Sequence, residues 1–519
     1  MEEKKKLLWV DDEIDQLKSH IIFLEDRGYT VVPVSNGDDA ISLVQKSRFD
    51  IVLLDEMMPG KDGLSTLVEI KEFDPNVPVV MVTKSEEERL MDEAIGRRID
   101  DYLTKPVNPS QILSACKRIL DARTIQGQQL AKDYVSEFNR LKAQLATGQM
   151  GWREWVEVHK DLSRWDLLLD RYPDVGLKQT HEDQKRECNH AFSKYIEDNY
   201  QRWLREEDPP VLSVDVIAEH LYPLLLAKKQ AYFVVIDCMR LDQWLAIEAI
   251  LAAYYDITNH HYYSILPTAT PYSRNALFSG LYPGEIAQRY PELWKPGTAD
   301  DQSKNRYERQ LLDRQIKKMG LTLYPEPKYV KVLDVDEAAS VSKKLSSYYE
   351  TPLTSMVFNF LDILAHGRSE SEILQEIAPD ESAFRSLMRS WFLHSYLFEI
   401  LKALAKRDVV VVVTTDHGSV LCTRGTKAFG KKDTSTNLRY KYGNNLRCDP
   451  KQSLFISKPK EFKLPAYSFN TTYIIAKEDF YFVYPTKFHE YQRQYKNSFQ
   501  HGGISLEEMI LPVAVMRPR

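Results

Sequence analysis

Near the N-terminus, residues that could handle a phosphoryl group follow short apolar stretches. Asp11 and Asp12 follow LLWV, Asp55 follows IVLL, Thr83 follows VVMV, and Lys105 follows YLT. In a parallel α/β sheet, the carboxyl ends of the strands meet in one crevice, which is where ligands bind. Three carboxylates there would repel one another unless a divalent cation joined them, and an all-oxygen site suits Mg²⁺. Lys105 could then neutralise a phosphoryl group on Asp55, and the Thr83 hydroxyl could hydrogen-bond to it.

A second set of potential ligands lies in the C-terminal part of the chain. Asp362 and His366 are four residues apart, so on a helix they share one face. Asp416 and His417 follow the apolar run VVVVVTT, and an adjacent charged pair in a buried crevice needs a partner. The complete set has three Asp, three His and one hydroxyl: Asp237, Thr270, Asp362, His366, Asp416, His417 and His501.

These residue types suit two zinc ions. Zinc takes about four N or O ligands, and two zinc ions bridged by a phosphate would lie roughly 4 Å apart. Two cations would cancel the anionic charge of a phosphodiester, activate a hydroxyl and stabilise the leaving oxygen. The hydroxyl would form a covalent phospho-enzyme that water then opens.

The segment TATPYSRNALFSGLYP contains the candidate nucleophile. Thr268, Thr270 and Ser273 are the competing hydroxyls, and Thr268 precedes the proline-flanked turn. A helix that begins just after Thr270 would direct backbone N–H groups at the phosphate. Arg274, one turn further on, could clamp a non-bridging oxygen, or it could be a charge on the helix surface.

Three regions must position these side chains, and we place them at residues 1–122, 123–207 and 208–519. In the first, LLWV, TVVPV, IVLLD, VPVVMVT and DYLTKP alternate with helical stretches, which predicts a parallel sheet covered on both faces. In the second, apolar residues recur every three or four positions up to Thr147-Gly148, which indicates a small helical bundle. The third follows Asp208-Pro209-Pro210 and is again α/β, with the buried strands AYFVVID, SMVFNF and VVVVVTTD.

Composition narrows the class of protein. The chain has 519 residues, 43% of them hydrophobic, and a formal net charge of −6, which excludes a histone-like polyanion binder. Its five cysteines are scattered without a CxxC pair, which argues against a disulfide framework. No apolar run approaches the ~18 residues of a membrane span, and the N-terminus is unlike a signal peptide. We expect a cytoplasmic protein without a membrane span.

The segment from Arg424 to Lys463 is locally basic. It contains 11 Lys or Arg and 3 Asp or Glu, with aromatic residues interleaved. Positive charge attracts polyphosphates and aromatic faces stack bases, so the segment could serve an oligonucleotide-type substrate. A solvated loop explains the same pattern, and the sequence leaves both interpretations open.

Residues 4–122 resemble the receiver domain of two-component response regulators, which has a flavodoxin-like fold. The acidic pair, the segment LLDEMMPGKDG, Thr83 and Lys105-Pro106 match in order. The resemblance implies that a sensor histidine kinase phosphorylates Asp55. It also implies that Asp12, Asp55 and the Met57 carbonyl bind Mg²⁺ beside Asp11, and that Tyr102 is the switch aromatic. We expect a cis peptide bond before Pro106, since Lys105 must point into the site.

Residues 211–519 resemble the PglZ branch of the alkaline phosphatase superfamily. The order Asp, Thr, Asp-x₃-His, Asp-His, His is complete. The resemblance implies a zinc-dependent phosphodiesterase in which Thr270 is the nucleophile. One zinc is then held by Asp362, His366 and His501, and the other by Asp237, Asp416, His417 and Thr270. The nucleophile segment lacks the cysteine that sulfatases convert to formylglycine, which counts against a sulfatase.

The whole arrangement resembles the PorX-type response regulators associated with type IX secretion. It implies phosphorylation-dependent homodimerisation and control of secretion genes, with a sigma factor and secretion-system components as partners. No helix-turn-helix signature is present in the sequence, so direct promoter DNA binding is not expected. The alternative function is a phospho-switched interaction module whose phosphatase-like domain chiefly binds a partner. Intact ligand residues favour the enzyme.

Overall fold

The computed structural model describes the chain except residues 1–3, 75, 85–98, 295–304, 431–436 and 486–487. The described chain forms two compact units. One comprises residues 1–137 and 171–176, and the other comprises residues 138–170 and 177–519. Each unit is built around its own sheet. Among the described helices, none is both long and apolar enough to cross a membrane.

The N-terminal unit contains a five-stranded parallel sheet in the order β2-β1-β3-β4-β5. Alternate residues of a strand point to opposite faces, so Leu7 and Trp9 join one apolar cluster while Leu8 and Val10 join another. The predicted sheet with two covered faces is therefore confirmed. The elements are β1 Lys5–Val10, α1 Lys18–Glu25, β2 Tyr29–Val34, α2 Gly37–Lys46, β3 Ile51–Asp55, α3 Gly63–Phe73, β4 Val79–Thr83 and β5 Asp101–Thr104.

Three helices follow this sheet. Helix α5, Pro109–Thr147, begins in the N-terminal unit and ends in the C-terminal one, at the predicted stop before Gly148. Helices α6, Trp152–Arg171, and α7, Lys178–Trp203, complete the predicted helical region. The side chains of Trp155, Phe192 and Trp203 belong to the same apolar cluster as β6 and β10 residues of the large sheet. Helices α6 and α7, which we call the connector, therefore share a hydrophobic core with the C-terminal α/β region.

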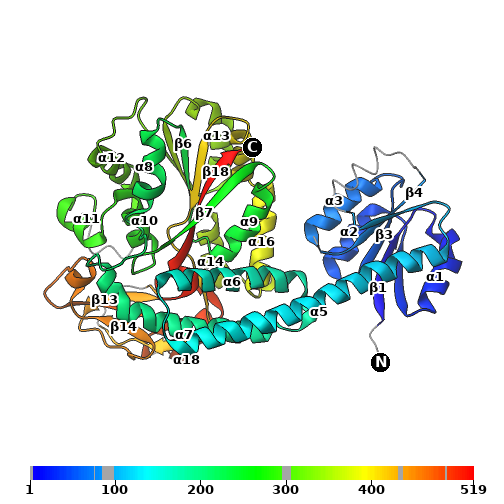
Figure 1. Cartoon of the computed structure of the whole chain (residues 1–519), viewed down its shortest axis with the longest axis horizontal. Coiled ribbons are helices and arrows are strands. Elements are labelled where there is room, and N and C mark those ends of the chain that lie inside the picture. The colour runs from blue at the N-terminus through cyan, green and yellow to red at the C-terminus, as the bar shows by residue number, and fades with distance from the viewer. Residues whose placement is uncertain (1–3, 75, 85–98, 295–304, 431–436, 486–487) are drawn as a thin grey trace. The chain divides into compact units, whose positions relative to one another are not determined.

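The C-terminal unit contains a six-stranded sheet in the order β7-β18-β10-β6-β9-β8. The three predicted strands become its neighbouring parallel strands β10, β6 and β9. Helices α8, α10 and α12 lie on one side of this sheet, and α9 and α16 lie on the other (Figure 1). The strands are β6 Ala231–Ile236, β7 Tyr255–Tyr263, β8 Lys328–Val332, β9 Leu353–Phe358, β10 Val410–Thr414 and β18 Ile510–Pro518.

Two helices of this unit carry predicted ligands: α10 begins at Thr270, and α14 contains Asp362 and His366. The helices that follow α7 in the chain are α8 Tyr222–Leu226, α9 Leu241–Leu251, α10 Thr270–Ser279, α11 Pro283–Arg289, α12 Glu308–Lys318, α13 Val335–Lys343, α14 Phe360–Glu370, α15 Glu372–Ile377, α16 Glu381–His394, α17 Tyr396–Leu404, α18 Phe488–Tyr495 and α19 Leu506–Met509.

Smaller sheets link β10 to β18 along the chain. They consist of β11 Val420–Cys422 with β17 Ser498–Gln500, β12 Arg424–Lys427 with β16 Phe480–Val483, and β13 Tyr440–Asn444 and β14 Ser453–Ile456 on either side of β15 Thr471–Ala476. Because β11 pairs with β17, the chain just after His417 lies beside the chain just before His501.

Candidate phosphorylation site and metal centre

In the N-terminal unit, the strand ends bring the predicted acidic residues together. Asp11 follows β1 and Asp55 is the last residue of β3, while Asp12 is the exposed member of the trio. Ligand oxygens of the three lie within 4.8 Å of one another. Lys105 Nζ lies 2.8 Å from Asp55 Oδ2 and 2.9 Å from Asp11 Oδ2. The peptide bond between Lys105 and Pro106 is cis, as predicted.

The charge balance of this cluster fits a magnesium ion. Burial raises the pKa of Asp55, and the hydrogen bond and charge of Lys105 oppose that rise. One ammonium beside three carboxylates leaves a negative excess, and hard oxygen ligands suit Mg²⁺. The exposed position of Asp12 leaves the cluster accessible on that side.

The other predicted receiver residues lie around this cluster. The Met57 N–H donates to Asp55 Oδ1 at 3.4 Å. The Thr83 hydroxyl donates to the Glu56 carboxylate, so Glu56 is a contact that the sequence pattern did not indicate. Tyr102 on β5 is 41% exposed. It lies three residues before Lys105, whose ammonium contacts Asp55.

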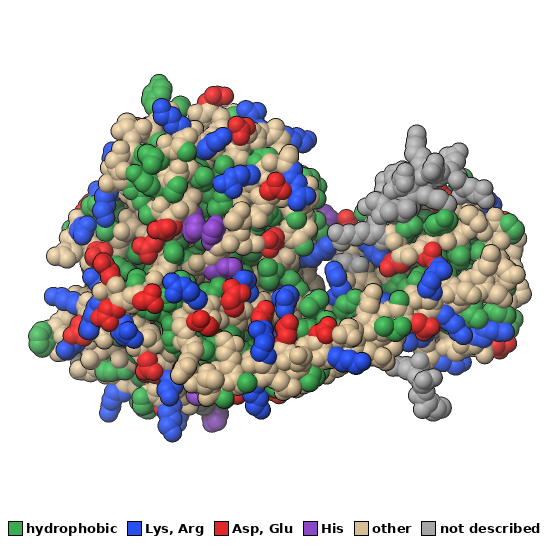
Figure 2. Space-filling view, in the orientation of Figure 1, with side chains coloured by type: hydrophobic (Ala, Val, Ile, Leu, Met, Phe, Trp, Pro, Cys, Tyr) green, Lys and Arg blue, Asp and Glu red, His purple; other side chains and the backbone are tan. Residues whose placement is uncertain are grey.

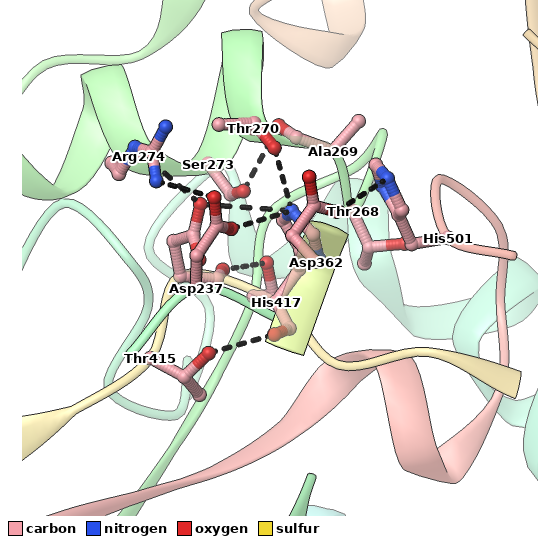
Figure 3. A network of polar contacts seen from close by, with 12 residues as sticks. Asp237, Thr268, Ala269, Thr270, Ser273, Arg274, Asp362, Thr415, His417 and His501 are labelled. Carbon is pink, nitrogen blue, oxygen red and sulfur yellow. Dashed lines mark hydrogen bonds and ion pairs between the residues drawn. The ribbon is translucent and has the colours of Figure 1, made fainter. Parts of the chain in front are cut away.

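In the C-terminal unit, six of the predicted ligands form two clusters. The Asp237 cluster consists of Asp237, Asp416 and His417, and the Asp362 cluster consists of Asp362, His366 and His501. Asp237 directly follows β6, while Asp416 and His417 follow β10. The rings of His417 and His501 stack with their centroids 4.1 Å apart, so the clusters adjoin. Sequence segments separated by up to 264 positions therefore converge on one centre (Figure 3).

The buried carboxylate oxygens of the two clusters indicate whether a metal ion fits between these side chains. Both side-chain oxygens of Asp416 and one each of Asp237 and Asp362 are buried with no hydrogen-bond partner among the described residues. Burying a charged oxygen without a partner is costly, and cations commonly remove that cost. His417 Nε2 lies 3.6 Å from an oxygen of each aspartate in its cluster. Mixed imidazole and carboxylate donors suit zinc, so the residues fit such an ion.

The electrostatics of the centre agree with this fit. Burial raises the pKa of Asp237 well above its usual value, although the Arg274 guanidinium opposes the rise. Burial lowers the pKa of His501 well below its usual value, which favours the neutral imidazole that a metal requires. Burial alone would raise the pKa of Asp362, but His366 and His501 hold it well below its usual range.

Thr270 lies at the Asp237 cluster. It is the first residue of α10, and its Oγ1 lies 2.9 Å from His417 Nε2 (Figure 3). The competing hydroxyls bond elsewhere: Thr268 Oγ1 donates to the Gly503 carbonyl and Ser273 Oγ donates to the Ala269 carbonyl. The geometry thus favours Thr270 as the nucleophile.

The start of α10 offers fewer donors than the sequence indicated. The N–H groups of Tyr272 and Ser273 both donate to the Ala269 carbonyl, and Pro271 has no N–H group. The expectation that several N–H groups of the first turn bind the phosphate is therefore wrong for Tyr272 and Ser273.

Arg274 is buried beside the Asp237 cluster. It is 1% exposed, so the interpretation as a surface charge is wrong. Its Nη1 lies 2.7 Å from Asp237 Oδ2 and its Nε lies 2.7 Å from Glu308 Oε1, so two carboxylates hold the guanidinium at the Asp237 cluster. Asn305 Nδ2 donates to both Glu308 Oε1 and the Thr270 carbonyl. Sequence reasoning missed Asn305 and Glu308, since no strand end or ligand spacing marks them.

The described cations of the basic segment 424–463 divide between internal contacts and exposed positions, the exposed ones being Lys427, Arg447, Lys451, Lys458 and Lys460. Arg439 is fully buried and pairs with Glu508, and Arg424 pairs with Glu478. Lys441 is buried, which lowers its pKa to about 8. Figure 2 shows Lys and Arg side chains interspersed with Asp and Glu on the face drawn. Arg439 and Lys441 are therefore absent from the surface, and residues 431–436 lie outside the described chain.

Family comparisons divide the chain into three parts. Residues 216–516 match the BREX system PglZ alkaline phosphatase-like domain. Residues 7–117 match the response regulator receiver domain, and residues 124–204 match the PorX response regulator linker domain.

Individual relatives resemble the N-terminal part. The transcriptional regulatory protein BaeR of Escherichia coli O6:H1 is 33% identical over 148 residues, 27% of this chain and 60% of BaeR. The corresponding protein ResD of Bacillus subtilis is 34% identical over 115 residues, 22% of this chain and 48% of ResD. The matches thus span about half of these relatives. A CheY-like receiver domain from Methanospirillum hungatei is 28% identical, with 23% of this chain and 95% of that chain covered and a TM-score of 0.22.

Proposed function

Because this chain belongs to the PglZ alkaline phosphatase-like family and has the receiver and linker domains of a PorX-type response regulator, we propose that phosphorylation of Asp55 controls a zinc-dependent phosphodiesterase. The observation that carries the enzymatic part is the set of buried carboxylate oxygens that accept no hydrogen bond from the described residues, together with the Thr270 hydroxyl 2.9 Å from His417 Nε2. A domain that served only as an interaction surface would have no need to keep these charges in its interior.

In the proposed reaction, Thr270 Oγ1 forms a bond to phosphorus while the bond from phosphorus to the ester oxygen breaks. An alcohol leaves with the proton that the Thr270 hydroxyl loses, and water then cleaves the bond between phosphorus and Thr270, which releases a phosphomonoester and restores the hydroxyl. Bound zinc would supply Lewis-acid charge compensation for the phosphate and for the leaving oxygen. Arg274, held by Glu308, keeps Asp237 in place, so we assign it to positioning. Nearly half of the His366 side chain is exposed, which leaves the Asp362 cluster open to substrate and water.

The proposal extends to the partners. A receiver domain takes its phosphoryl group from a donor such as a sensor histidine kinase. Regulation of type IX secretion, by way of a sigma factor or secretion-system components, is proposed on the PorX-type domain arrangement alone.

Substrate preference tests the enzymatic proposal. With zinc supplied, a model phosphodiester should be hydrolysed faster than the matching monoester, because the proposed activity is that of a phosphodiesterase. Chelation should abolish turnover and added zinc should restore it. Steady-state rates with and without chelator measure both effects. If the purified protein held no transition metal and cleaved neither ester, the interaction-module alternative would replace the enzyme.

Oligonucleotides provide a related prediction about substrate class. If they are the physiological type of diester, they should be cleaved faster than the model diester, and salt should reduce that advantage. The rate ratio at low and high salt is the measurement. An advantage that salt does not change would show that the basic residues do not attract the substrate.

Phosphorylation of the receiver is expected to promote a homodimer. Tyr102 is exposed and lies three residues before Lys105, which contacts Asp55, so phosphorylation of Asp55 can alter the surface that Tyr102 presents. Light scattering with and without beryllofluoride, a phosphoryl mimic, should show the mass rising towards twice the monomer mass. An unchanged mass at micromolar concentration would contradict this prediction.

A further inference from the structure

Helix α7 of the connector contributes Lys185 to a buried network of ion pairs, which also includes Arg240 at the start of α9. Lys185 Nζ lies 3.1 Å from Asp166 Oδ2 of α6 and 2.8 Å from Glu381 Oε2 of α16. Arg240 also bonds to Glu381, at 2.6 Å, and Arg385 bonds to Asp242 at 2.8 Å. We call this set the Lys185 network: Asp166, Lys185, Arg240, Asp242, Glu381 and Arg385. Each of the three cations is at least 91% buried.

The network touches the loop that carries Asp237. Arg240 is three residues after Asp237, at the start of α9, and Glu381 bridges it to Lys185. The Met239 N–H donates to the Thr415 hydroxyl at 3.0 Å, and the same hydroxyl donates to the His417 carbonyl at 2.8 Å. The residues that follow Asp237 are thereby tied to the residues around His417.

Asn189, one turn after Lys185 on α7, holds the short helix α19. Its Oδ1 accepts from the Leu506 N–H at 2.8 Å, and its Nδ2 donates to Glu507 Oε2 at 3.0 Å. Asn189 and Glu507 are both buried, so each of these bonds is made out of contact with bulk water. An amide that uses both its donor and its acceptor fixes the orientation of α19 as well as its position.

Helix α19 in turn contacts both metal-binding loops. A Cβ atom added at Gly418 would lie 1.9 Å from the Glu507 carbonyl oxygen, so the backbone after His417 packs directly on α19. On the other side, Glu508 Oε1 accepts from the Gly503 N–H at 2.8 Å, two residues after His501. A displacement of α19 would therefore move His417 and His501, one ligand from each cluster.

We propose that Lys185 and Asn189 of the connector are positioning residues for the metal centre, acting through α19 and the Arg240 loop. The inference rests on the proposed function, because it assigns the two clusters to metal. Neither side chain belongs to a ligand cluster. Groups that orient metal ligands typically alter metal affinity or activity by about 10–100-fold when they are removed.

Asn189→Ala in the full-length protein is the main test. It removes both bonds to α19 without leaving a buried charge on α7. The zinc dissociation constant, measured by chelator competition, should rise by roughly tenfold or more. At saturating zinc, kcat should fall while KM changes little, and the visible absorption spectrum of the cobalt-substituted protein should shift. Arg186→Ala is the matched control on the same helix, since its side chain is half-exposed and pairs with Asp183. It should leave all three measurements unchanged.

Lys185 supplies a second test that includes a conservative rescue. Lys185→Met leaves Asp166 and Glu381 without this cation and should weaken zinc binding together with folding. Lys185→Arg keeps the charge and should recover most of the zinc affinity.

The inference would be overturned if Asn189→Ala lowered only the melting temperature and kept wild-type zinc affinity, kcat and cobalt spectrum. Its failure is distinguishable from failure of the proposed function. In the first case the wild-type protein binds zinc and Asn189→Ala matches it, and in the second the wild-type protein binds none.

Discussion

Thr270→Ala is expected to lower phosphodiester turnover by at least about 10³-fold, because loss of the nucleophile in a covalent mechanism removes most of the catalysis. Zinc content should stay close to wild type, since six other side chains, in the Asp237 and Asp362 clusters, remain to hold the metal. Steady-state kinetics together with metal analysis of the same preparation measure the two quantities.

Two further variants test whether the effect is specific to the Thr270 hydroxyl and whether activity depends on the metal. Ser273→Ala is the matched control, because the Ser273 hydroxyl bonds to the Ala269 carbonyl of its own helix, and turnover should stay near wild type. His417→Ala should lose both metal and activity, because alanine offers no ligand in place of the imidazole. Wild-type turnover by Thr270→Ala would contradict the assignment of the nucleophile.

Asp55→Ala should abolish phosphorylation of the receiver. Asp55 and Asp11 are the buried carboxylates at the strand ends, and the Lys105 ammonium lies 2.8 Å from Asp55. Incubation with a small phosphodonor and Mg²⁺ should add one phosphoryl group to the wild-type protein by intact mass spectrometry, and none to the variant. Removing Mg²⁺ should suppress the reaction of the wild type, because the cation offsets charge on the incoming phosphoryl group.

Asp15→Ala serves as the control for this measurement. Asp15 lies close in sequence to the acidic pair, but its side chain is 91% exposed, and it pairs with Lys18. It should be phosphorylated like the wild type. Undiminished labelling of Asp55→Ala would mean that another residue accepts the phosphoryl group.

The sequence alone predicted the five strands of the N-terminal sheet, three of the six strands of the large C-terminal sheet and the residues that gather at their ends. Strands such as β1 and β6 are short apolar runs that end next to a carboxylate, and parallel strands place such ends along one edge. That rule brings Asp11 to Asp55 and Asp237 to Asp416 without any knowledge of side-chain contacts. The four-residue spacing of Asp362 and His366 likewise follows from helical geometry alone.

Only the tertiary structure decided how those residues are supported. Arg274 has the sequence position of a phosphate clamp, and Asp237 and Glu308 hold its guanidinium. Arg439 contributes to a basic segment in the sequence but is fully buried against Glu508. The partners in these three pairs are between 34 and 69 positions apart. Residue type and local spacing do not specify which distant carboxylate a buried cation contacts, because the packing of the whole unit decides which side chains come together.

The connector illustrates the same limit. The sequence predicted its helices, but only the structure shows that Phe192 and Trp203 pack in a common core with the C-terminal sheet.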